Sequence, residues 1–204
     1  MAETLDRQVA ASADDCKVAW DGSAWALDLT FVNNVVGYTS STNYKMGCGM
    51  RFLNIPIPKG STINSAKLTL TCRLSRSNTI VNSKLRGEDA DNAAAFSDYA
   101  DYSGRPRTTN QVTWNNIPAW TAETEYDSPD ITSIIQEIID RAGWASGNAL
   151  VIFWDDHDDI STHVDNTHRH AYSYDSSPAK APNLHIEYTP PAAGGARSHG
   201  YIMG

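Results

Sequence analysis

The feature that most constrains the fold is a strict alternation of apolar and polar residues at positions 66–74 (AKLTLTCRL). The apolar set is Ala66, Leu68, Leu70, Cys72 and Leu74, and the polar set is Lys67, Thr69, Thr71 and Arg73. A period of two places each set on its own face of an extended strand. One apolar and one wet face are typical of an antiparallel sheet, so the sequence predicts such a sheet.

Other segments extend this predicted sheet. Residues 183–189 (NLHIEYT) repeat the alternation, and residues 79–87 are expected to pair with residues 66–74. The run at 149–154 (ALVIFW) is apolar on both faces, as expected of a buried central strand. Frequent turn residues separate these short strands. The pattern favours a mainly β protein, an antiparallel, jelly-roll-like β-sandwich.

One helix is expected at about residues 131–141. Its isoleucines follow the spacing i, i+3, i+4, i+7 and i+8, at Ile131, Ile134, Ile135, Ile138 and Ile139. This spacing places all five on one face of a helix. We therefore expect one amphipathic helix that closes an end of the sandwich.

The chain divides into three predicted parts. Residues 1–15 are polar and have little periodicity, so we expect an N-terminal arm there. Residues 16–189 form the predicted sandwich domain. Residues 190–204 begin with Pro-Pro, continue through Gly-Gly and end near Tyr201, Ile202 and Met203. This tail is either disordered or a flexible arm whose apolar tip docks on a neighbouring subunit.

Charge and composition exclude several classes of protein. Lys and Arg number 16 and Asp and Glu number 24, which gives a net charge of −8. A protein that binds nucleic acid non-specifically needs a basic face, so we expect no nucleic-acid partner. The run at 149–154 is the longest apolar stretch and is too short for membrane insertion. The first fifteen residues lack the apolar core of a secretory signal peptide, so export by that route is not expected.

Catalytic motifs are missing from the sequence. It contains no GxSxG, no Walker A loop and no GxGxxG. The three cysteines form no CxxC, which excludes the zinc-ribbon and thioredoxin patterns, and a reducing cytoplasm would keep them as free thiols. We expect a protein that is not an enzyme. A hydrolase with an unrecognised pair of carboxylates stays open as an alternative.

Two acidic loops are candidate Ca²⁺ sites, because Ca²⁺ takes six to eight oxygen ligands. The first follows the predicted buried strand and contains Asp155, Asp156, Asp158 and Asp159. The second contains Glu88 and Asp91. Neither loop has the EF-hand spacing, and the alternative is that these carboxylates are solvated loop residues.

Three histidines have the spacing H-x4-H-x-H, at His163, His168 and His170. On a strand, His168 and His170 would share a face, so a transition-metal site is geometrically conceivable. The alternative is that the three histidines are ordinary polar residues of a loop and a strand edge.

Trp20 and Trp25 are the candidate glycan contacts. Exposed aromatic rings stack on the faces of sugars. Trp114 lies in VTWNNIP and Trp144 follows the predicted helix, so we expect both of these to pack in the core.

Four segments in fixed order carry a resemblance to a known family. They are GMRFLNIPIPKGSTINSAKLTLTCR, QVTWNNIPAW, SPDITSIIQEIIDR and AYSYDSSPAKAPNLHIEY. From about Met50 to Tyr188 the chain resembles the DNRLRE-type modules of extracellular and cell-surface proteins. The resemblance implies a jelly-roll-like sandwich and a non-catalytic role related to modules that bind acidic polysaccharides. It carries over no catalytic or ligand residue.

Such modules usually lie inside long secreted chains, whereas here the module makes up nearly the whole sequence. Stand-alone modules of this kind resemble phage structural or appendage proteins. The main hypothesis is a virion structural protein, a decoration, tail or fibre-type subunit. It would assemble through its body and terminal arms with copies of itself and other virion proteins. It would be made in the host cytoplasm and be extracellular after release.

The alternative hypothesis is a carbohydrate-binding module of an extracellular or cell-surface protein. Its partner would be a cell-surface polysaccharide and its candidate cofactor Ca²⁺.

Overall fold

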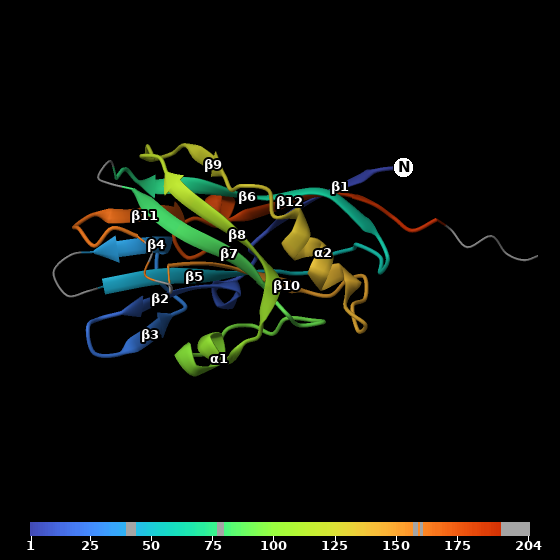
Figure 1. The fold of residues 1–204 in the computed structure, drawn as a ribbon, viewed down its shortest axis with the longest axis horizontal. Coiled ribbons are helices and arrows are strands. Elements are labelled where there is room, and N and C mark those ends of the chain that lie inside the picture. The colour runs from blue at the N-terminus through green and yellow to red at the C-terminus, as the bar shows by residue number, and fades with distance from the viewer. Residues whose placement is uncertain (40–43, 77–79, 157–158, 160, 193–204) are drawn as a thin grey trace, which may run out of the picture.

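The computed structural model describes residues 1–39, 44–76, 80–156, 159 and 161–192. The predicted fold class is confirmed, because 48% of the chain is strand and 12% is helical, in an antiparallel, sandwich-like arrangement (Figure 1). The strands are β1 (Glu3–Gln8), β2 (Asp15–Trp20), β3 (Trp25–Asp28), β4 (Asn33–Thr39), β5 (Tyr44–Phe52), β6 (Thr62–Leu74), β7 (Val81–Glu88), β8 (Arg107–Ile117), β9 (Glu125–Asp127), β10 (Leu150–Asp155), β11 (Thr167–Tyr172) and β12 (Asn183–Thr189). The α-helices in this part of the chain are α1 (Tyr99–Gly104) and α2 (Thr132–Asp140).

The strands form one curled sheet with the order β1-β12-β6-β11-β4-β5-β10-β7-β8. The hairpin of β2 and β3 joins it at β5, and β9 joins it at β6. The curl brings β6 and β12 opposite β7 and β10, so that their apolar faces share one core (Figure 1). Side chains such as Leu68 and Leu184 meet Leu85 and Trp154 in this main core.

The strand at the centre of the molecule is buried on both faces, as its apolar run predicted. Ile152 and Trp154 of β10 belong to the main core. Val151 and Phe153 belong to a second core on the opposite face of β10. That second core also contains Cys16, Val18, Ala93, Phe96 and Tyr102.

The amphipathic helix is confirmed at α2, within one residue of its predicted start and end. Four of the five isoleucines lie in α2 and are buried, and Ile131 is buried at its N-cap. Each isoleucine side chain that leaves water contributes roughly 1.5–3 kcal/mol, so this face holds α2 on the sheet. The short helix α1 was not predicted.

The predicted N-terminal arm, residues 1–15, contains strand β1, which pairs with the sheet. Residues Glu3–Gln8 pair antiparallel with β12, from Glu3 opposite Tyr188 to Gln8 opposite Asn183. Leu5 is the one buried side chain in this strand, so periodicity gave no signal. Backbone hydrogen bonds to the neighbouring strand hold it instead. Tyr201, Ile202 and Met203 of the predicted tail lie outside the described residues.

Candidate functional site

The carboxylates at the end of β10 are engaged within the fold. Asp155 is buried and pairs with Arg86 at 3.2 Å. Asp156 is buried and accepts a hydrogen bond from the Ser161 amide at 3.2 Å. Asp159 lies 2.8 Å from the Lys45 ammonium. Burial opposes ionisation of Asp159, but hydrogen bonds from Lys45 and His163 lower its pKa. Asp158 lies outside the described residues.

The second acidic loop lies at the other end of β10. Glu88 is buried and pairs with Arg105 at 2.9 Å, and Asp91 pairs with Arg141 at 2.8 Å. The loop is fixed there by a hydrogen bond from the Ala93 amide to the Ala149 carbonyl. In the register of β7 and β10, Gly87 lies opposite Ile152, so about four residues, or roughly 13 Å of strand, separate Glu88 from Asp155. The two carboxylates therefore cannot share a cation.

The described residues contain no group of three or more His, Cys, Asp or Glu side chains placed to hold a metal ion. The Ca²⁺ site therefore stays a prediction.

The histidines separate into a buried pair and an outlying residue. His168 and His170 share a face of β11, as expected, and their ring centroids are 4.5 Å apart. His163 lies elsewhere, where it stacks on Tyr38 with centroids 4.4 Å apart. The Nε2 atom of His168 accepts a hydrogen bond from Arg76 at 3.0 Å. This bond uses the Nε2 lone pair and so disfavours metal binding at that atom.

The two tryptophans proposed as glycan contacts lie side by side. Trp20 and Trp25 pair across the β2–β3 hairpin with ring centroids 5.9 Å apart, and both are half-buried. Trp25 in turn stacks on Tyr99 of α1, at 5.5 Å with an interplanar angle of 4°. We call Trp20, Trp25 and Tyr99 the aromatic shelf. The other four tryptophans, Trp114, Trp120, Trp144 and Trp154, are buried, as expected for Trp114 and Trp144.

A tight turn sets the register of the two tryptophans. The Asp21 carboxylate accepts hydrogen bonds from the amides of Ser23 at 2.8 Å and Ala24 at 2.9 Å. These bonds lower the pKa of Asp21. Gly22 has a φ of +99°, a conformation that costs glycine little. The D-G-S-A sequence therefore places Trp20 directly opposite Trp25.

The third member of the shelf comes from α1, which a cap and a buried ion pair hold in place. The Asp98 side chain accepts a hydrogen bond from the Asp101 amide and caps α1. Arg105, which follows α1, pairs with Glu88 of β7. Tyr99 stacks on Tyr102 at 6.4 Å, and Tyr102 is fully buried. Sequence reasoning missed Tyr99 because a helix of six residues shows too little periodicity.

A groove of about 440 Å³ lies along the same hairpin. It is lined by Lys17, Ala19, Ala26, Leu27, Asp28, Leu29 and Ser97. The Lys17 ammonium lies 3.6 Å from the centre of the Phe31 ring, and burial lowers the pKa of Lys17. Apolar surface with a few charged and hydroxyl groups suits a ligand that has both apolar faces and hydroxyls.

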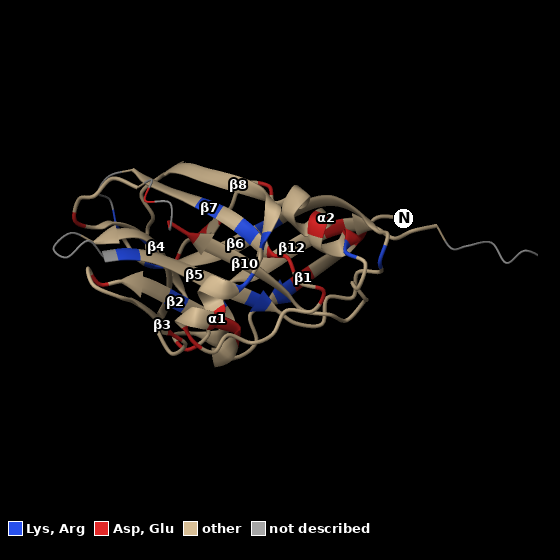
Figure 2. Cartoon of the chain, turned by 60° about the horizontal axis from the view of Figure 1, so that its bottom comes forward, with Lys and Arg blue, Asp and Glu red and all other residues tan. Residues whose placement is uncertain are grey.

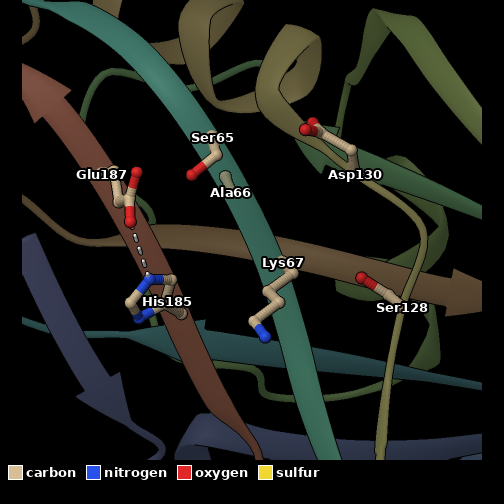
Figure 3. Close-up of a pocket in the computed structure, with 7 residues that line it drawn as sticks. All are labelled: Ser65, Ala66, Lys67, Ser128, Asp130, His185 and Glu187. Atoms are coloured by element: carbon tan, nitrogen blue, oxygen red, sulfur yellow. Dashed lines mark ion pairs between the residues drawn. The ribbon is translucent and has the colours of Figure 1, made fainter.

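A second groove, of about 310 Å³, crosses the polar outer face of β6 and β12 (Figure 3). His185 and Glu187 project from β12 beside Lys67 of β6 (Figure 3). Here Asp6 lies 2.9 Å from His185, and Asp127 lies 2.6 Å from Lys67. In each pair the two charged or polar groups are partners of each other, and no Trp, Tyr or Phe lines this groove.

The Ser128 hydroxyl in this groove also has its hydrogen-bond partners within the fold. Ser128 Oγ accepts from the Leu68 amide and donates to the Pro129 carbonyl. It is therefore held by the backbone and is not hydrogen-bonded to a base that would activate it as a nucleophile.

Charges of both signs are interleaved over the face that Figure 2 presents, with acidic residues on both helices. Neither described helix is long and apolar enough to cross a membrane. Together the fold and the shelf define an antiparallel β-sandwich with a half-exposed aromatic surface at one hairpin. A comparison of the chain with protein-family models and with curated proteins found no match.

Proposed function

We propose that this chain is a non-catalytic, carbohydrate-binding β-sandwich protein that contacts its ligand through the aromatic shelf. The observation that supports this proposal is the adjacency of Trp20, Trp25 and Tyr99, at centroid distances of 5.9 and 5.5 Å. All three rings are half-buried, and Trp25 and Tyr99 also pack on the second core, so the exposed parts of the rings are the surface that would contact the faces of sugar rings. Lys17 and Asp28 line the groove along the hairpin, but the alternation along β2 and β3 places them on the face opposite Trp20 and Trp25, so the shelf rings carry the proposed contact.

Binding to an array of neutral and acidic polysaccharides tests this proposal, followed by calorimetry of the best ligand. Replacing Trp20 and Trp25 with Ala should weaken binding by about tenfold or more, since each aromatic contact contributes roughly 0.5–1.5 kcal/mol. Tyr126→Ala is the matched control, because Tyr126 is a half-buried ring that stacks on Trp120, at 4.7 Å. Equal affinity of the double variant and the parent would refute the assignment of the shelf, and so would an array without binding. Release of sugar products would refute the non-catalytic role.

The second proposal is that of a virion structural subunit, and the sheet edges favour it. Among the described strands, β1 pairs with β12 alone and β8 pairs with β7 alone. An unpaired edge presents a row of N–H and C=O groups that can add a strand from another chain. Light scattering of the full chain, and of a chain that lacks residues 190–204, measures the assembly. A stable monomer in both cases would contradict this role.

A further inference from the structure

The pair formed by His168 and His170 occupies the interior of the sheet. Strand β11 lies between β4 and β6, with His170 opposite Val35 on one side and Leu74 on the other. His168 is 3% exposed and His170 is 9% exposed. The pairing with β6 changes register between His170 and Ala171, so the ladder is irregular at this point.

The hydrogen bonds of His168 require a neutral ring. Its Nε2 atom accepts from Arg76, so that nitrogen carries no proton. Its Nδ1 atom lies 3.3 Å from the Tyr38 carbonyl oxygen and donates to it. Protonation of His168 would place a second donor against the Arg76 guanidinium and break this arrangement.

His170 has no acceptor for a second proton. Within the described part of the chain, neither its Nδ1 nor its Nε2 has a hydrogen-bond partner, and both atoms are buried. An imidazolium needs two acceptors, and burying an unpaired charge is costly. Only a neutral ring is therefore compatible with this packing.

The charges around the pair also oppose protonation. The cations that act on the two rings are Arg73 from β6, Arg76 two residues after β6, Lys17 from β2 and Arg169 from β11 itself. Asp165, in the loop before β11, acts on His168 in the opposite sense. Burial is the largest cause and lowers the pKa of His168 to about 4 and that of His170 to about 3.

We propose that His168 and His170 form an acid-sensitive switch, in which proton uptake by the two rings opens the seam between β4, β11 and β6. An unfolded histidine has a pKa near 6.5, so the unfolded chain binds more protons than the folded chain below that pH. The stabilisation by the neutral pair is complete above about pH 6.5 and is lost as the pH falls toward about 4. Each ring raises the unfolding equilibrium constant by about tenfold per pH unit in this window.

Two buried carboxyls, Asp15 and Glu88, act in the opposite direction, because burial raises the pKa of each, and both have to be separated from the histidine pair. Burial raises the pKa of Asp15 to about 6, although Asn34 and the Tyr174 amide donate hydrogen bonds to it. The folded chain therefore holds this proton more tightly than the unfolded chain does, which adds stability as the pH falls through about 6. A comparison of variants at each pH removes both contributions, because Asp15 and Glu88 are present in all of them.

Urea unfolding at several pH values from about 7 to about 4.5 tests the switch. His170→Phe keeps a ring in the site but removes one titrating group. We expect the unfolding equilibrium constant of this variant to rise less steeply with acid than that of the parent, by about a factor of ten per pH unit. His185→Gln is the matched control, because His185 is a half-exposed strand histidine beside Asp6. A loss of acid dependence in this control as large as in His170→Phe would show that the effect is not specific to the buried pair.

A second measurement does not require a variant that folds. In the native parent protein, NMR of the imidazole nitrogens should show His168 and His170 neutral at about pH 5, with His168 protonated on Nδ1. Titration of either ring with an ordinary midpoint near 6.5 in the folded protein would overturn the proposal. Identical acid dependence in the parent and in a folded His170→Phe or His170→Gln variant would also overturn it.

Discussion

Arg105 is a buried cation that ties α1 to the sheet, and Arg105→Met should be strongly destabilising. Its guanidinium lies 2.9 Å from Glu88 of β7 and 2.7 Å from Asp101 of α1. It also donates to the backbone carbonyls of Ala94 at 2.9 Å and Ala95 at 2.6 Å. The Arg105 side chain is 5% exposed and that of Glu88 is 9% exposed, so water can replace few of these bonds.

The expected cost follows from the partner that is left behind. Without Arg105, Glu88 becomes a buried carboxylate that has lost its hydrogen-bonded cation and keeps only the weaker influence of Arg107, and breaking a buried pair in this way costs about 3–5 kcal/mol. Burial already raises the pKa of Glu88, against the pull of Arg105, so the loss of Arg105 removes the opposing influence. Glu88→Gln in the same chain removes the unpaired charge and should recover about 1–3 kcal/mol.

Urea unfolding measures both variants, and tryptophan fluorescence reports on the shelf, because α1 carries the Tyr99 ring that stacks on Trp25. Lys67→Met is the matched control, since Lys67 and Asp127 are 42% and 47% exposed and such pairs contribute about 0–1 kcal/mol. A cost below about 1 kcal/mol for Arg105→Met would refute the role of the ion pair. A double variant no more stable than the single variant would show that the uncompensated Glu88 charge is not the cause.

Three further outcomes are expected. Gly37→Ala should lower the free energy of unfolding by about 2 kcal/mol or more, because Gly37 has a φ of +109° and an added Cβ would lie 2.2 Å from the Thr167 carbonyl oxygen. Thermal unfolding measures this loss. Gly104→Ala is the control and should be far milder, because nothing lies within 4 Å of a Cβ added there. The three buried cysteines, Cys16, Cys48 and Cys72, should react with a thiol reagent only after denaturation, because burial raises the pKa of each thiol. Rapid labelling of the native chain would contradict this. A chelator should leave the melting temperature unchanged, because Asp155 and Glu88 already pair with arginines, and a drop that added Ca²⁺ restores would establish a cation site.

The parts of the fold that could be predicted are those with a local pattern. The alternation at residues 66–74 predicted β6, and the isoleucine spacing predicted α2. The apolar run at 149–154 predicted β10, whose two faces fill two different cores. In each case, the periodicity of one segment matches the face that it buries.

The parts that were missed depend on contacts between distant residues. Strand β1 is held by β12, and the bond from Tyr188 to Glu3 spans 185 positions of the chain. Helix α1 depends on Glu88, which lies 17 positions before Arg105. Neither segment has a hydrophobic pattern of its own that could have indicated its structure.

The candidate site shows the same division between local and distant contacts. The D-G-S-A turn places Trp20 opposite Trp25 through local hydrogen bonds; the sequence analysis named both residues as candidates but did not predict that they pair. The acidic loop could not be interpreted in the same way, because the cation that neutralises Asp155 is Arg86, 69 positions earlier. From the sequence alone, a run of carboxylates resembles a metal-binding loop, because the arginine that pairs with it is distant in the chain.

The aromatic shelf therefore depends on tertiary structure more than on either of the segments that build it. A hairpin joined to the sheet by one strand and a helix of six residues are each marginal alone. The stack of Trp25 on Tyr99 joins them, and the pair of Arg105 with Glu88 anchors the helix to β7. A ligand that bridges Trp20 and Trp25 would add to this same junction. Binding at the shelf and the stability of α1 are thus expected to be coupled, because both depend on how α1 is held against the sheet.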